Sequence, residues 1–149
     1  MRLYFSGAIA GGREHLPVYQ HIVARLQAAG LEVPSAHVAD PDVLAREAWL
    51  SPRAVYERDI RWVEESAAMI AEVSTPSLGV GYEVAHALHL GKPVLCLYRR
   101  DLFISKMITG NSAPRLTVAA YADLAELDAH LDAFVRSLGA SSAAAGRAR

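Results

Sequence analysis

Short apolar segments alternate with helix-like segments along the chain, and this alternation constrains the fold more than any other feature. Two of the apolar segments are almost continuously apolar, as expected for strands buried on both faces of a sheet. The segments between them place apolar residues at helical spacing. Strands and helices in this alternation predict an α/β fold with helices on both faces of a parallel sheet. The five predicted strands are Leu3–Phe5, Leu31–Val38, Ala67–Val73, Pro93–Tyr98 and Leu116–Tyr121.

Helix-boundary signals support this reading. Ser51 followed by Pro52 is typical of an N-cap and a first helical turn, and Gly30 and Gly91 are placed to end two other helices. We expect a Rossmann-like sheet with the flavodoxin-like strand order. In such sheets ligands bind at the carboxyl ends of the strands, so functional residues are sought there.

The length of 149 residues fits one domain. The last large apolar residue at helical spacing is Leu138, and the ten residues from 140 onward offer nothing larger than alanine for burial. We therefore expect a folded domain over residues 1–139 and a disordered tail over residues 140–149.

Composition and charge exclude several classes of protein. The formal net charge is -1, which gives no electrostatic field for gripping a nucleic-acid polymer. No apolar stretch approaches the ~20 residues that a membrane span needs. The single cysteine, Cys96, lies in an apolar run and has no partner for a disulfide in its own chain. These features predict a small soluble protein of the cytoplasm.

The most informative segment for chemistry runs from residue 72 to residue 83. It leaves a predicted buried strand, passes a glycine-rich turn and enters a helix. Ser77 and the backbone amides from Gly79 onward are suited to hold an anion at the helix N-terminus. We place Glu83 in the first helical turn, where the helix dipole favours the ionised carboxylate. Such a carboxylate can attack a sugar carbon, although a solvated glutamate that stabilises its helix fits the spacing too.

A second carboxylate, Asp59, lies in the middle of the helix that begins at Ser51. Its apolar neighbours Ile60 and Trp62 suggest partial burial, although the same helix carries several other acidic residues. Glycosyl transfer uses two carboxylates in unlike environments, one as nucleophile and one to handle a proton. A surface role for Asp59 is the alternative. His86 and His89 lack a third ligand at matching spacing, so no metal site is expected.

Four motifs, in this order, resemble those of the 2′-deoxynucleoside 5′-phosphate N-hydrolases, which belong with the nucleoside 2-deoxyribosyltransferases. The longest and most specific is Pro-Ser-Leu-Gly-Val-Gly-Tyr-Glu, which ends at Glu83. The resemblance extends from about Leu3 to Leu138. The four motifs lie at residues 4–14, 59–62, 71–83 and 105–110.

The resemblance implies a Rossmann-like enzyme that cleaves the N-glycosidic bond of a deoxynucleoside monophosphate, without a metal or an organic cofactor. Glu83 would attack the anomeric carbon and form a covalent intermediate that water resolves. Asp59 would assist protonation of the leaving base or position the ribose. Tyr4 would orient Glu83 and crowd the space that a 2′-hydroxyl needs.

The resemblance also implies how the substrate is held. The phosphate pocket would be formed by Ser77, the Gly79 amide and a Ser105 supplied by the neighbouring subunit of a homodimer. The family commonly carries Ser and Arg where this chain has Ala8 and Ala10, which removes two possible phosphate contacts. The remaining residues expected at the substrate are Gly7 and Arg13 of the first loop and, facing the base, Ile9, Leu78 and Met107.

Two other functions remain open at this point. A deoxyribosyltransferase would pass the sugar to a second base instead of water. A non-catalytic nucleotide-binding module on the same fold would bind the nucleotide and form no product. The presence of both Asp59 and Glu83 argues against the binding module, because binding alone needs no attacking carboxylate beside an anion pocket.

Overall fold

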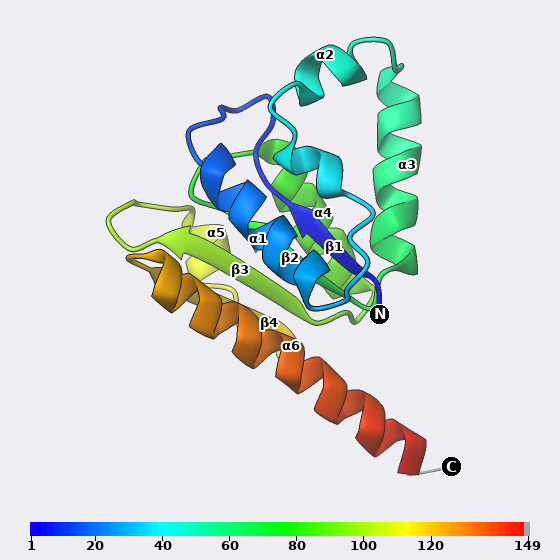
Figure 1. The fold of residues 1–149 in the computed structure, drawn as a ribbon, viewed down its shortest axis with the longest axis vertical. Helices are drawn as coiled ribbons and strands as arrows, with labels where there is room; N and C mark the ends of the chain where they lie inside the picture. Colours follow the sequence, from blue (N-terminus) through cyan, green and yellow to red (C-terminus); the bar gives the residue numbers. More distant parts are fainter. Residues whose placement is uncertain (148–149) are drawn as a thin grey trace.

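The computed structural model describes residues 1–147, with side chains described to residue 140, and this part of the chain forms a four-stranded parallel sheet between two layers of helices (Figure 1). Neighbouring strands follow the order β1-β2-β3-β4, and each pair is parallel. The elements in chain order are β1 (Leu3–Ser6), α1 (Leu16–Ala28), the 3₁₀ helix η1 (Ala36–Ala39), α2 (Val43–Glu47), α3 (Pro52–Glu65), β2 (Ala68–Glu72), α4 (Leu78–His89), β3 (Val94–Arg99), α5 (Lys106–Thr109), β4 (Leu116–Tyr121) and α6 (Leu124–Arg147).

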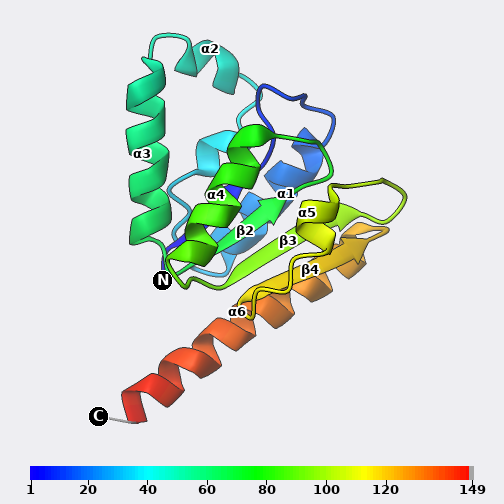
Figure 2. The same cartoon turned by 180° about the vertical axis from the view of Figure 1, so that it is seen from behind.

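The two faces of the sheet carry separate hydrophobic cores. Helices α1 and α6 cover one face together with η1, and α3, α4 and α5 cover the other (Figures 1 and 2). Because side chains alternate along a strand, Leu3 and Phe5 of β1 enter the α1 and α6 core while Tyr4 enters the α4 core. The α/β architecture with helices on both faces of a parallel sheet is therefore confirmed.

The expectation of five strands is wrong, because the segment Leu31–Val38 is not a strand. It pairs with the sheet only through the isolated bridge between Arg2 and Glu32. Pro34 has no N–H to donate to a ladder. The next residue, Ser35, instead uses its side chain: Oγ accepts a hydrogen bond from the Phe5 N–H at 2.9 Å and donates one to the Phe5 carbonyl at 2.7 Å. The Ser35 side chain thus pairs with the Phe5 N–H and C=O groups, which a fifth strand would otherwise have paired with through its backbone.

The helix-boundary signals are confirmed. The Ser51 Oγ accepts a hydrogen bond from the Ala54 N–H at 3.1 Å, which caps α3. Gly30 and Gly91 adopt positive φ angles of 75° and 71° just after α1 and α4. A glycine adopts this left-handed conformation without steric cost, so both helices end where the sequence predicts.

A buried carboxylate ties the carboxyl ends of the strands together. Glu72, at the end of β2, is fully buried and accepts hydrogen bonds from the Ser74 hydroxyl and, at 2.9 Å, from the Tyr121 hydroxyl. The Ser74 Oγ also accepts a hydrogen bond from the Arg99 N–H at 2.8 Å. Burial raises the pKa of Glu72. The loops that leave β2 and β3 are therefore fixed to each other beneath the edge where ligands are expected.

The C-terminal helix extends beyond the expected domain boundary. Leu138 packs in the core, but the backbone of α6 continues as helix to Arg147, where we expected disorder from residue 140. The alanines in this stretch have the highest intrinsic helix propensity, which accounts for the difference. Residues 148–149 lie outside the described part of the chain, and the division into a domain over residues 1–139 and a tail stays a prediction.

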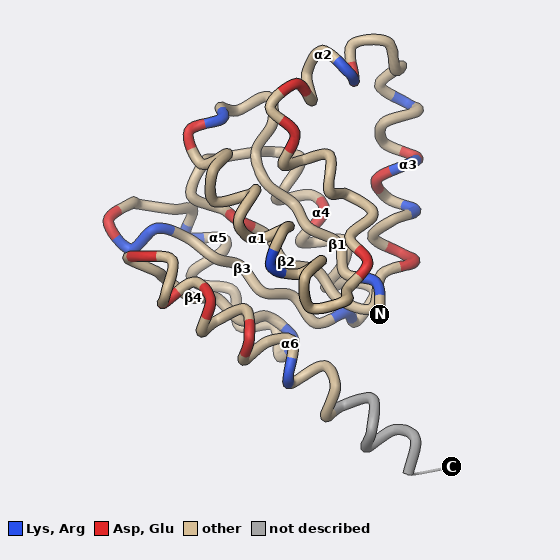
Figure 3. Tube along the Cα trace, in the orientation of Figure 1, with Lys and Arg blue, Asp and Glu red and all other residues tan. Residues whose placement is uncertain are grey.

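Charged residues of both signs are interspersed over the described chain, and α3 shows this clearly (Figure 3). None of the helices in the described part of the chain has the length and hydropathy needed to cross a bilayer. The blue and red positions in Figure 3 are mixed along the described residues, in keeping with the formal net charge of -1.

Candidate functional site

The carboxylate of Glu83 is held by two hydroxyls from β1. The Tyr4 hydroxyl donates a hydrogen bond to Oε1 at 2.9 Å, and the Ser6 hydroxyl donates one to Oε2. Tyr4 and Ser6 are two residues apart on the strand, so both side chains point to the α4 face. Both oxygens of Glu83 are therefore fixed by donors before any substrate is present.

The electrostatics of Glu83 differ from the expectation. Helix α4 begins at Leu78 with Ser77 as its N-cap, so Glu83 lies in the second turn and not in the first. Burial raises the pKa of Glu83 to about 7, although the hydrogen bonds from Ser6 and Tyr4 lower it. The helix dipole acts mainly within the first turn and does not offset the loss of solvation here. Near neutral pH the carboxylate and the carboxylic acid are both populated.

Burial raises the pKa of Tyr4 too, and the neighbouring negative charge of Glu83 raises it further. The phenol consequently stays protonated throughout the physiological range and remains a hydrogen-bond donor to Glu83. This favours the ionised form of Glu83, because a carboxylate accepts such a bond better than a carboxylic acid does.

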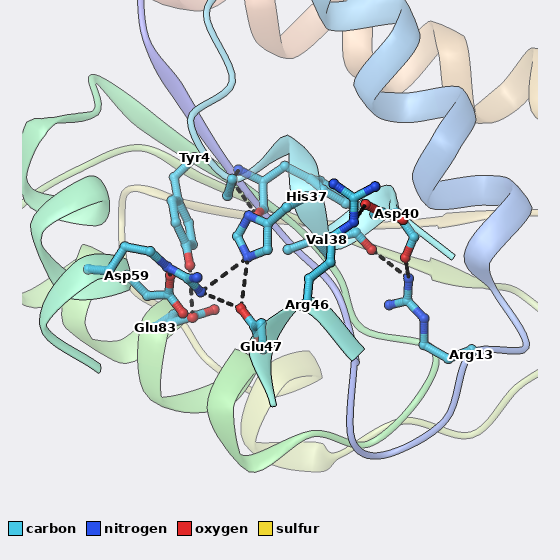
Figure 4. Close-up of polar contacts among 12 residues, drawn as sticks. Tyr4, Arg13, His37, Val38, Asp40, Arg46, Glu47, Asp59 and Glu83 are labelled. Carbon is cyan, nitrogen blue, oxygen red and sulfur yellow. Dashed lines mark hydrogen bonds and ion pairs between the residues drawn. The ribbon is translucent and has the colours of Figure 1, made fainter. Parts of the chain in front are cut away.

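Asp59 lies on α3 within a cluster of charged side chains. Its Oδ1 accepts a hydrogen bond of 2.8 Å from the Nε of Arg58. Arg58 also contacts Glu47 of α2 at 2.5 Å and the Nε2 of His37, within η1, at 3.1 Å. Figure 4 shows Tyr4, Glu83, Asp59, His37 and Glu47 grouped together, with Arg13 well apart from them. The two carboxylates expected from the sequence thus lie in one region.

A cavity of about 520 Å³ opens beside this cluster, and both Asp59 and Glu83 line it. Apolar and aromatic side chains from α3, α4 and the loop before α3 make up most of its wall, as is usual for a site that binds a small organic molecule. Gly79, which the sequence places at the phosphate as an expectation, lines this cavity. The other lining residues are Glu47, Leu50, Pro52, Val55, Tyr56, Ile60 and Tyr82.

Four of the other residues expected at the phosphate and the base lie around a second cavity, of about 570 Å³, on the other side of α4. Ser77 and Leu78 reach it from the start of α4, and Ser105 and Met107 reach it from the start of α5. Ser77 and Ser105 are both N-caps, since their Oγ atoms accept hydrogen bonds from the N–H groups of Val80 and Met107. Within one chain, Ser105 and Glu83 therefore line different cavities.

The first loop has a more structural role than expected. A Cβ on Gly7 would lie 2.9 Å from the Tyr19 ring, so this position needs glycine. Ile9 packs against the α1 and α6 core. The Arg13 guanidinium donates hydrogen bonds to the carbonyls of Ala8, Val38 and Asp40 at 3.1, 2.7 and 2.9 Å. Gly7, Ile9 and Arg13 are not among the residues that line the two cavities.

Sequence reasoning missed Ser6 and Arg58. Ser6 could have been found from the two-residue period of β1, which places it beside Tyr4. Arg58 gave no comparable signal, because adjacent residues on a helix do not face each other. Among the described residues no group of three or more His, Cys, Asp or Glu side chains is arranged to hold a metal ion.

This combination of fold and site defines a class of protein. The family model for nucleoside 2-deoxyribosyltransferase matches residues 3–128. The chain belongs to the nucleoside 2-deoxyribosyltransferase family.

Within this family the chain is similar to curated N-hydrolases. It is 46% identical to a putative 2′-deoxynucleoside 5′-phosphate N-hydrolase 1 from Methanococcoides burtonii over 79% of this chain and 97% of the relative. It is 40% identical to the 5-hydroxymethyl-dUMP N-hydrolase of Rattus norvegicus over 94% and 90% of the two chains.

Solved structures share the fold. The CMP N-glycosidase BcmB of Clostridium botulinum superposes with a TM-score of 0.67 at 21% identity, covering 90% of this chain and 99% of that one. A 2-deoxyribosyltransferase from Bacillus psychrosaccharolyticus superposes with a TM-score of 0.57 at 18% identity, covering 85% and 90%.

Proposed function

We propose that the protein hydrolyses the N-glycosidic bond of 2′-deoxynucleoside 5′-monophosphates, releasing the free base and 2-deoxyribose 5-phosphate. The observation that carries this proposal is the Glu83 carboxylate, which Tyr4 and Ser6 hold at a cavity that Asp59 also lines. Relatives at 40% identity or more bear the names of N-hydrolases for such nucleotides. The buried, single Cys96 is in keeping with work in the cytoplasm.

In the proposed mechanism one oxygen of Glu83 attacks the anomeric carbon C1′. A bond from that oxygen to C1′ forms as the bond from C1′ to the base nitrogen breaks, and the base leaves with the electron pair. Asp59 assists protonation of the departing base. A water molecule then attacks C1′ and gives a proton to Asp59 as the bond from C1′ to the Glu83 oxygen breaks. This step restores the Glu83 carboxylate and gives the free sugar phosphate. Tyr4 and Ser6 keep the attacking carboxylate in one orientation throughout.

The proposed phosphate pocket uses Ser77, the Gly79 amide and a Ser105 from a second copy of the chain. Ser105 lines a different cavity from Glu83 in its own chain, so a contribution across a dimer interface is consistent with its position. The rim of the Ser105 cavity is strongly apolar and exposed, as expected of a surface that a second subunit covers. Leu78 and Met107, which line that cavity, are 97% and 81% exposed. Phe103, the neighbour of the lining residue Ile104, is 88% exposed.

A second candidate is transfer of the deoxyribosyl group to another base, which the family model and the Bacillus structure favour. The two reactions share the covalent intermediate and differ only in whether water or a base resolves it. One experiment separates them: incubation with a deoxynucleotide in the presence and absence of a different free base, followed by chromatography. A new nucleotide indicates transfer, and free base with 2-deoxyribose 5-phosphate in both samples indicates hydrolysis.

The same chromatographic assay tests the proposed substrate class. The panel contains deoxynucleoside monophosphates, including 5-hydroxymethyl-dUMP, the matching nucleosides without phosphate and the matching ribonucleotides. We expect base release from the deoxynucleoside monophosphates and little from the ribonucleotides. Nucleotide binding with no base release over long incubation contradicts the proposal and supports a non-catalytic binding module.

A further inference from the structure

Arg58 is the most highly connected side chain at the candidate site, and it is only 19% exposed. Its Nε donates a hydrogen bond to Asp59, its Nη2 contacts Glu47 and His37, and its guanidinium lies over the Trp62 ring at 5.0 Å from the ring centroid. The cation–π contact and the bonds to two carboxylates fix the plane of the guanidinium.

The pairing of Arg58 with Asp59 is unusual for a helix. Side chains one residue apart on a helix diverge by about 100°, so they do not normally meet. Arg58 reaches Asp59 because Glu47, His37 and Trp62 hold the guanidinium in place. The orientation of Asp59 therefore depends on contacts from α2 and η1, not on the geometry of α3 alone.

The bond from Arg58 occupies only one oxygen of Asp59. No other hydrogen bond to the Asp59 carboxylate occurs among the described residues, so Oδ2 is left for a ligand in the cavity. The second partner of Arg58, Glu47, lines the same cavity from α2. One guanidinium thus links two walls of the cavity, α2 and α3.

We propose that Arg58 is a positioning residue of the active site, which orients the Asp59 carboxylate toward substrate and offsets the negative charge that Asp59 places near Glu83. This inference rests on the proposed function. The groups that face Arg58 come from several elements: Glu47 on α2, His37 on η1 and Asp59 on α3. Glu83 on α4 and Tyr4 on β1 also respond to its charge.

The pKa of Glu83 responds to Arg58 and Asp59 in opposite directions. Burial raises that pKa most, Asp59 raises it further and Arg58 lowers it. Replacing Arg58 with a neutral side chain is therefore expected to raise the pKa of Glu83, whereas a lysine keeps the charge but loses the planar fork that contacts two carboxylates.

The test compares Arg58→Gln, Arg58→Lys and, as matched control, Arg53→Gln. Arg53 lies on the same helix, is 86% exposed and pairs with Glu57. Base release from a deoxynucleoside monophosphate is measured from pH 5 to pH 9, and thermal unfolding shows that each variant folds.

For Arg58→Gln we expect kcat to fall roughly tenfold or more and the acid limb of the pH profile to move up by ~0.5–1 pH unit. For Arg58→Lys we expect the acid limb at its wild-type position but a lowered kcat. For Arg53→Gln we expect the wild-type kcat and the wild-type pH profile.

A folded Arg58→Gln variant with unchanged kcat and an unmoved acid limb overturns the proposal. Equal losses in Arg58→Gln and Arg58→Lys with no movement of the limb overturn it as well, since they indicate a purely structural role. If the wild-type protein releases no base, the proposed function fails, but the inference about Arg58 is still measurable. Carbon-13 NMR of the Glu83 carboxyl must then show a higher titration midpoint in Arg58→Gln than in wild type, and equal midpoints contradict the inference.

Discussion

The Ser6 hydroxyl donates a hydrogen bond to Oε2 of Glu83, although 77 residues separate the two in the chain. The strand β1 brings Ser6 and Tyr4 to the same face of the sheet, where α4 presents the carboxylate. Tyr4 and Ser6 of β1 thus hold the Glu83 carboxyl in one orientation, and burial raises the pKa of that carboxyl to about 7. The proposed activity and its pH dependence both follow from this arrangement.

The first prediction concerns the pH dependence of activity. Because Glu83 attacks as a carboxylate and burial raises its pKa to about 7, kcat/KM should fall about tenfold per pH unit below pH 7. Steady-state base release measured from pH 5 to pH 9 checks this. An acid limb near pH 4.5, the ordinary range of a glutamate, would show that Glu83 does not act as the attacking group from this environment.

The second prediction concerns stability. A carboxyl whose pKa is raised on folding binds its proton more tightly in the folded state. Relative to the ionised form, the protonated Glu83 stabilises the folded state. This stabilisation is complete below the pKa that Glu83 has in the unfolded chain, and it is lost as pH rises through about 7. The ionised Glu83 therefore costs roughly 3 kcal/mol of folding free energy at pH 8.

Glu83→Gln should remove this cost, so it should raise the free energy of unfolding at pH 8 and change it little at pH 4. Denaturant unfolding of both proteins at the two pH values measures the difference. A stabilisation that is the same at both pH values is not compatible with a raised pKa of Glu83.

The third prediction concerns Ser6. Loss of its hydrogen bond in Ser6→Ala should disfavour the Glu83 carboxylate and move the acid limb of the activity profile up by about one pH unit. Ser66→Ala is the matched control, because Ser66 is also buried and its Oγ has no hydrogen-bond partner among the described residues. The control should keep the wild-type profile, and a Ser6→Ala profile identical to it would mean that the hydroxyl has no influence on Glu83.

The fourth prediction concerns the proposed dimer. Ser105→Asp keeps a good N-cap for α5 but places a negative charge where the phosphate would bind. Both Ser105→Asp and Glu83→Gln homodimers should be nearly inactive. Coexpression with two affinity tags yields the mixed dimer, in which one site has an intact Glu83 and an intact Ser105 from the other subunit.

This mixed dimer should show about half of the wild-type activity. If Ser105 serves its own chain, each site of the mixed dimer carries one defect and the activity stays near that of the homodimers. Light scattering of the purified mixed species gives its mass and confirms that a dimer is being assayed.

Much of the fold could be predicted because local signals agree with the final packing. The apolar runs that became β2 and β3 are buried as expected, and Ser51 caps α3 where its side chain predicts. The segment Leu31–Val38 is the exception, because its apolar composition predicts a strand that the structure does not form. Its backbone pairing fails at Pro34, and Ser35 completes β1 through a side chain.

The candidate site was only partly predictable. Glu83 and Asp59 could be singled out from residue type and context, and the structure brings them to one cavity. The sign of the Glu83 pKa shift could not be predicted, because burial depends on how α4 packs against β1. The contacts of Arg58 and Arg13 depend in the same way on segments distant in sequence, which no local pattern encodes.

Covalent capture tests the attack by Glu83 most directly. The probe is a 2-deoxy-2-fluoroarabinonucleoside 5′-monophosphate, whose fluorine disfavours the positive charge that develops at C1′ when water resolves the intermediate. Mass spectrometry of intact and digested protein should show one added fluorinated sugar phosphate on the peptide that carries Glu83, and none in Glu83→Gln. Base release by the wild-type protein with no added mass, or with the mass on another residue, contradicts the account.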